Sequence, residues 1–135
     1  MLKAQQKDFS MAKIPTNTLP ADKTNAYMWQ GNLQDAMQAL RTRRDPRFEV
    51  LLEHGSMSVE IYAPDKSDPQ TPHRQDELYI VQSGSGMFYR GGSHCPFGAG
   101  DVLFVPAGID HRFEDFSDDF VTWVIFWGPE GGEAP

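Results

Sequence analysis

Short hydrophobic runs separated by turn residues fill the chain from residue 48 to residue 127, and they constrain the fold more than any other feature. Each run is short for a helix, and glycine, proline or aspartate residues lie between the runs. The expected strands are 48–53, 56–63, 77–83, 86–90, 101–105, 111–116 and 120–127. Seven or so short strands with turns between them predict an all-β sandwich or barrel.

The segment that precedes the strands is predicted to be an arm followed by one short helix, together residues 1–47. Pro15 and Pro20 interrupt the polar residues up to about 31. Apolar residues recur at helical spacing over 33–43, Asn32 is placed to cap that helix, and Pro46 ends it. The barrel is expected over 48–127, and the Gly-, Pro- and Glu-rich residues 128–135 are expected to be disordered.

Charge and composition narrow the classes of partner and the compartment. Twelve basic and nineteen acidic residues give a net charge of −7, so an acidic surface is expected to repel nucleic acid and anionic membranes. No apolar segment reaches the length of a membrane span, and the N-terminal residues lack the apolar core of a signal peptide. A single cysteine, Cys95, excludes an intrachain disulfide. The sequence therefore predicts a cytoplasmic protein whose ligand is a small molecule.

The last expected strand, 120–127, is apolar on both faces. One face carries Val121, Trp123, Ile125 and Trp127, and the other carries Val124 and Phe126. A strand that is apolar on both faces is expected to be buried on both. One face can fill the barrel and the other needs a further neighbour, so a homodimer is predicted.

Two segments place histidines beside expected strands. In the first, His73 is followed by Glu77 and, six residues later, by Gly84. In the second, Gly100 precedes a Pro-x-Gly turn at 106–108, and His111 follows it. These segments resemble the two motifs of the cupin superfamily over roughly residues 48–127.

The resemblance also has departures. Thr71 occupies the place of the first motif histidine, Asp65 that of the opening glycine, and Asp115 that of an asparagine. The resemblance implies a jelly-roll barrel that binds a small polar molecule at or beside a metal. It implies a metal-dependent, dioxygenase-like enzyme; the alternatives are a non-catalytic binding or regulatory barrel, and a sugar-phosphate isomerase or epimerase.

The candidate metal ligands are His73, Glu77 and His111, with Gln75 as a further ligand or supporting donor. Two imidazoles and one carboxylate suit iron or zinc, and manganese or nickel also accept these donors. On a straight strand, His73 and Glu77 would lie roughly 13 Å apart, too far to share an ion, so a bend is required between them. Without a bend, Gln75 would share a face with His73 or Glu77.

Glu77 and Tyr79 are the candidate catalytic residues. Glu77 combines the roles of ligand and base, and Tyr79 lies on the same face of its strand, where it either donates a hydrogen bond to substrate or fills the core. A metal-free epimerase would instead need His111 paired with Asp110 or Asp115.

Overall fold

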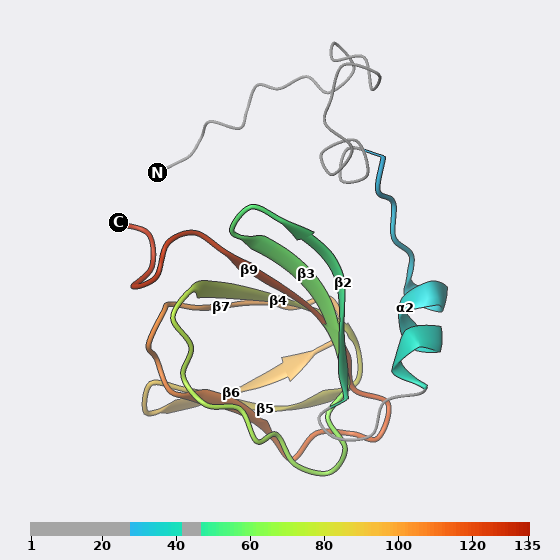
Figure 1. Ribbon diagram of the computed structural model, residues 1–135. Helices are drawn as coiled ribbons and strands as arrows, with labels where there is room; N and C mark the ends of the chain where they lie inside the picture. The colour runs from blue at the N-terminus through green and yellow to red at the C-terminus, as the bar shows by residue number, and fades with distance from the viewer. Residues whose placement is uncertain (1–27, 42–46) are drawn as a thin grey trace.

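The computed structural model of the protein describes residues 28–41 and 47–135. Their elements are α2 (Leu33–Leu40), β2 (Phe48–His54), β3 (Met57–Tyr62), β4 (Asp76–Ser83), β5 (Ser85–Arg90), β6 (Ser93–Gly98), β7 (Val102–Val105), β8 (His111–Glu114) and β9 (Val121–Trp127). The strands form two antiparallel sheets that enclose a barrel (Figure 1), with orders β2-β3-β9-β4-β7 and β6-β5-β8. The prediction of an all-β barrel with one short helix is confirmed, although the helix ends at Leu40 rather than at the expected residue 43. Pro46 and the predicted arm up to residue 27 lie outside the described residues.

Aromatic side chains from both sheets fill the space between them. Tyr79, Phe88 and Phe113 are fully buried and lie in edge or tilted ring contact, with centroid distances of 4.8 Å from Phe113 to each of the other two. Tyr79 and Val81 alternate with Glu77 on β4 and point inward, as the strand period predicts. This packed layer closes the barrel on one side of the site.

Helix α2 packs against the outer face of the five-stranded sheet. The Asn32 side chain accepts a hydrogen bond from the Asp35 backbone N–H at 2.9 Å, which caps the first turn. Ala36 and Leu40 are buried in a second apolar cluster with Ile61 of β3. Figure 1 shows α2 outside the barrel, beside β2, so the helix leaves the barrel interior to the strands.

Gly84 supplies the tight connection between β4 and β5. Its φ of +90° lies in the region that favours glycine, and a Cβ there would stand 2.5 Å from Phe120 Cα. The backbone of Phe120 therefore approaches β4 only because residue 84 has no side chain.

The structure differs from the sequence expectations at two places. Residues 93–98 form an edge strand, β6, which is not among the strands expected from the sequence. The C-terminal residues 128–135, expected to be disordered, are held by hydrogen bonds from two of their backbone N–H groups: Gly131 N donates to Arg74 O at 2.8 Å and Glu133 N donates to the Asp76 side chain (Oδ2) at 2.9 Å. The tail therefore packs beside the start of β4. Within the described ranges, no helix has the length and apolar character that crossing a membrane requires.

Candidate metal centre

His73, Glu77 and His111 come together at one end of the barrel interior. Glu77 lies on β4 in one sheet, His111 begins β8 in the other, and His73 lies in the loop before β4. Their ligand atoms all lie within 4.8 Å of one another. Glu77 and His111 are 1% and 0% exposed, whereas His73 is half-buried. The cluster thus joins the two sheets and is open to solvent on the side of His73.

The required bend between His73 and Glu77 is present, because β4 begins only at Asp76. The chain turns through Arg74 and Gln75, which brings His73 Nε2 to 2.6 Å from Glu77 Oε1. A straight strand would hold these side chains far apart, so this local change of direction makes the cluster.

Backbone carbonyls fix the orientation of both imidazoles. His73 Nδ1 lies 2.8 Å from Gln75 O, and His111 Nδ1 lies 2.8 Å from Ile109 O. A carbonyl oxygen only accepts hydrogen bonds, so each Nδ1 carries a proton and donates it. In the neutral ring, this leaves the Nε2 lone pair free, the arrangement usual for histidines that bind metals.

Both Nε2 atoms are directed at the same carboxylate oxygen. His111 Nε2 lies 3.1 Å from Glu77 Oε1, and His73 Nε2 lies 2.6 Å from it. His111 Nε2 is buried, and its proximity to Glu77 does not satisfy hydrogen-bond geometry. Neighbouring ligands at ~2 Å from a metal stand roughly 3 Å apart, so these separations suit a shared cation. The donor set and the unsatisfied nitrogen therefore fit a divalent transition metal.

The electrostatics of the cluster also favour a positive charge between these atoms. Burial acts to raise the pKa of Glu77, but the adjacent His111 and His73 rings, which attract the carboxylate when they are protonated, outweigh it, so this pKa lies below its usual range. Burial acts to lower the pKa of His111, but Glu77, the Ile109 carbonyl and Asp68 together raise it above its usual range. The carboxylate is thus held in its anionic form.

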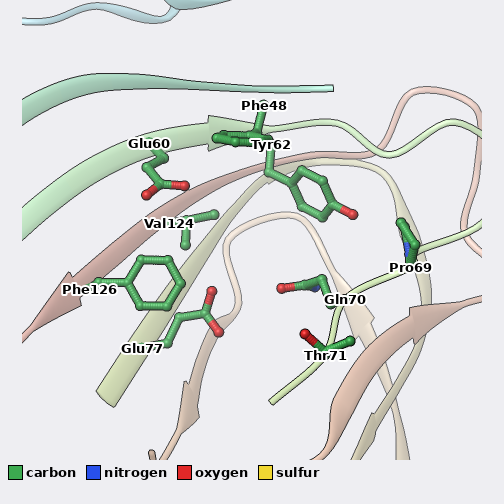
Figure 2. Close-up of a pocket in the computed structure, with 9 residues that line it drawn as sticks. All are labelled: Phe48, Glu60, Tyr62, Pro69, Gln70, Thr71, Glu77, Val124 and Phe126. Atoms are coloured by element: carbon green, nitrogen blue, oxygen red, sulfur yellow. The ribbon is translucent and has the colours of Figure 1, made fainter. Parts of the chain in front are cut away.

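A cavity of about 270 Å³ opens beside Glu77. Figure 2 shows the carboxylates of Glu60 and Glu77 directed into it, with Gln70 and Thr71 on the opposite side. The remaining lining residues are mainly apolar: Phe48, Tyr62, Pro69, Val124 and Phe126. A small molecule in this cavity would contact Glu77 directly.

Gln75 and Tyr79, the predicted site residues outside the cluster, do not line this cavity. The Gln75 side chain donates to Ser56 O at 2.7 Å and to Gly128 O at 3.0 Å, so its amide is engaged with backbone away from the cluster. Gln75 meets the site through its backbone carbonyl, which orients His73.

Tyr79 is fully buried, and its hydroxyl donates to Gln70 Oε1 at 2.8 Å. Burial, followed by the charges of Glu77 and Asp68, raises the pKa of Tyr79 well above its ordinary value. The phenol therefore stays protonated and holds the Gln70 side chain in the cavity wall. Core filling and polar support are thus combined in one side chain.

Sequence reasoning missed Glu60 and Asp68. Glu60 faces the cavity from β3, and strand alternation with Tyr62 was the signal available for it. Asp68 is 8% exposed; its Oδ2 accepts from Phe113 N at 2.8 Å and from Gln70 Nε2 at 2.7 Å. Asp68 lies in a proline-containing loop with no periodic pattern, so no signal pointed to it.

Comparison with known proteins places this barrel in a family. The cupin domain family matches residues 58–127, which contain the whole cluster. An uncharacterized protein of Streptomyces coelicolor is 38% identical over 98 residues, covering 71% of this chain and 93% of that protein. The HTH-type transcriptional activator RhaS of Yersinia pestis is 32% identical over 74 residues, which span 55% of this chain and 27% of the activator.

Solved structures share the fold. A cupin 2 conserved barrel domain protein from Salinispora arenicola superposes with a TM-score of 0.58 at 24% identity, covering 75% of this chain and 89% of that one. A suggested mannose-6-phosphate isomerase from Ralstonia eutropha superposes with a TM-score of 0.53 at 27% identity, covering 65% of this chain and 89% of that one. Because the family match spans just over half of the 135 residues and the Streptomyces relative aligns over most of both chains, this chain belongs to the cupin family.

Proposed function

We propose that this cupin is a metal-dependent, dioxygenase-like enzyme that acts on a small polar molecule in the barrel cavity. His73, Glu77 and His111 would hold the metal. The observation that supports this most directly is the pair of imidazole Nε2 atoms, 2.6 Å and 3.1 Å from one carboxylate oxygen, with both Nδ1 atoms engaged by backbone carbonyls. Iron, zinc, manganese and nickel all accept this donor set.

A metal bound there would supply Lewis-acid and, with iron, redox chemistry to substrate oxygen atoms. The chain's own residues divide the remaining work. Glu77 faces both the cluster and the cavity, so it is placed to take a proton from a bound molecule when it is not fully engaged as a ligand. Gln75 O and Ile109 O orient the imidazoles, and Tyr79 acts through Gln70.

Elemental analysis tests the metal assignment. The protein is purified from medium containing iron, zinc, manganese and nickel, and metal per chain is measured for the native sequence, His111→Ala and His94→Ala. His94 is a matched control, because it is half exposed and contacts Glu114 at 3.1 Å rather than the cluster. We expect metal close to one equivalent in the native protein and the control, and its loss in His111→Ala. A native protein without metal contradicts the proposal.

A second candidate function is a regulatory barrel that binds a ligand without chemistry. The 32% identity to part of a transcriptional activator favours it, and so does Thr71 in place of a motif histidine. The His111→Ala variant separates the two functions. An enzyme is supported if His111→Ala loses turnover while its fold stays intact. A regulator is supported if the native protein shows no turnover and His111→Ala binds the ligand with unchanged affinity.

We further propose that the protein is a homodimer. The outer face of β4, β7 and β9 is apolar, and Ile80, Val102 and Phe104 on it are 36%, 59% and 44% exposed. Helix α2 packs against β2, β3 and Val121 of β9, and leaves Ile80, Val102 and Phe104 exposed. A second copy packed on this face would bury side chains that otherwise meet water.

A further inference from the structure

We propose that the cavity selects an uncharged or cationic small molecule with a hydroxyl or amine group that binds Glu60, and that it rejects carboxylate and phosphate groups. This inference names the substrate class of the proposed enzyme and rests on that function. It begins from the position of Glu60, which pairs with Val124 of β9, while Glu77 pairs with Phe126 on the other side of the same strand. Two carboxylates thus flank β9 on the inner face of the sheet.

Glu60 has unused hydrogen-bonding capacity. Among the described residues, Ser58 Oγ donates a hydrogen bond to Glu60 Oε2 at 3.2 Å. A carboxylate accepts about four hydrogen bonds, so most of its lone pairs face the cavity without a protein donor. A ligand hydroxyl or amine could supply the missing donor.

The charge of Glu60 is held at a cost to the fold. Burial raises its pKa above the ordinary value, and the nearby charges of Glu77 and Glu53 add to that effect. A glutamine or leucine would avoid this penalty, because partly buried charges without a cation destabilise proteins. A group kept in so unfavourable a place is better explained by ligand binding than by packing.

No lysine or arginine is among the described residues that line this cavity. Arg74 lines only neighbouring hollows, where its guanidinium lies 3.4 Å from Glu130. A divalent metal bound by Glu77 as its one anionic ligand would carry a net charge of about +1 with that ligand, and the carboxylate of Glu60 would bring the net charge of the site to zero. An anionic ligand would therefore gain no net attraction and would meet Glu60, which disfavours the sugar-phosphate substrates considered from the sequence.

The apolar walls set the remaining character of the ligand. Phe48, Val124 and Phe126 present apolar surface, whereas Gln70 and Thr71 offer neutral polar groups on the opposite side. The volume of about 270 Å³ lies just below the range of drug-sized pockets. A compact ring or branched carbon skeleton with one or two donors fits this lining.

The test uses four probes that share an aromatic ring and differ in charge: benzyl alcohol, benzylamine, benzoate and phenyl phosphate. Binding to the zinc-loaded full chain is measured by NMR chemical-shift titration, and zinc content is measured on the same samples. We expect benzyl alcohol and benzylamine to shift cavity resonances and to bind about tenfold more tightly than the two anions. Glu60→Gln should weaken benzylamine about tenfold and strengthen benzoate, while retaining zinc.

Glu130→Gln is the matched control, because it removes the same charge from a side chain that is 75% exposed and does not line the cavity. Tighter binding of either anion, failure of both uncharged and amine probes to bind, or an unchanged order of affinities in Glu60→Gln overturns the inference. Absence of zinc from the native protein, with the order of probes as expected, instead overturns the proposed metal function and leaves the selectivity of the cavity in place.

Discussion

The substitution Glu77→Gln should remove most of the metal-induced stabilisation while leaving the metal-free fold intact. Glu77 is 1% exposed and contacts both imidazoles, so its removal by truncation would confound metal binding with packing. Glutamine preserves the volume. Its amide group carries two N–H donors, which can serve the Nε2 lone pairs that the backbone carbonyls leave free. We therefore expect the metal-free variant to unfold within about 1 kcal/mol of the native protein.

The expected size of the metal effect follows from binding linkage. At a free metal concentration about 100 times Kd, the native protein gains about 2.7 kcal/mol of unfolding free energy. In a domain with about 100 ordered residues, that corresponds to a rise in Tm of roughly 13 °C. Changing residues that only support ligands lowers metal affinity ~10–100-fold, so loss of the one anionic ligand should cost at least ~100-fold. The same concentration would then give the variant only ~0.4 kcal/mol, or about 2 °C.

The assay is thermal unfolding followed by circular dichroism, with zinc or manganese and with a chelator. Glu130→Gln serves as the control, because Glu130 is 75% exposed and borders a neighbouring hollow. It should show the full native shift. An equal metal-induced shift in Glu77→Gln would mean that the metal binds elsewhere, and the assignment of the cluster would be refuted.

Three further predictions concern the fold, the cavity and the outer face. Gly84→Ala should lower the free energy of unfolding by about 3 kcal/mol in chemical denaturation, because a Cβ would stand 2.5 Å from Phe120 Cα at a φ of +90°. A loss below about 1 kcal/mol would contradict this prediction. Because burial raises the pKa of Glu60 from 4.5, the native protein should lose stability relative to Glu60→Gln as pH rises through that raised pKa, and the difference should become constant below about pH 4.5. A pH-independent difference between their unfolding free energies would show that Glu60 is not desolvated. Phe104→Asp on the exposed face should shift a dimer to monomer in light scattering, and a native protein that is already monomeric at micromolar concentration would remove the dimer proposal.

Strand alternation and turn residues were enough to predict most of the barrel, because each strand has an inner apolar face and a clear boundary. β6 was missed because His94, Cys95 and Pro96 have weak strand character. The strand nevertheless forms at the edge of its sheet, where a proline is tolerated because it pairs on one side only. Pairing with β5, which is not visible in the local sequence, overrode the local propensity.

That His73, Glu77 and His111 lie together could be predicted from their resemblance to the two cupin motifs, and the bend at residues 74–75 from the distance that a straight strand would leave between His73 and Glu77. The role of Gln75 could not be settled in the same way. Its position two residues from both His73 and Glu77 made it a ligand on a straight strand, but the bend takes its amide to Ser56 O and Gly128 O. Local spacing fixes which residues lie near one another, whereas the direction of each side chain depends on contacts with distant segments.

The loop between β3 and β4 was the hardest part to interpret from sequence, and the geometry of the site depends on it. Asp68 accepts a hydrogen bond from the backbone N–H of Phe113, two residues beyond His111 on β8. The same loop continues to His73, so one buried carboxylate ties the segment carrying one imidazole to the strand carrying the other. Asp68 also accepts from Gln70, which Tyr79 holds in the cavity wall. Protein contacts thus fix the loop to both sheets, and positioning of this kind lowers the entropy lost when the three donors bind an ion.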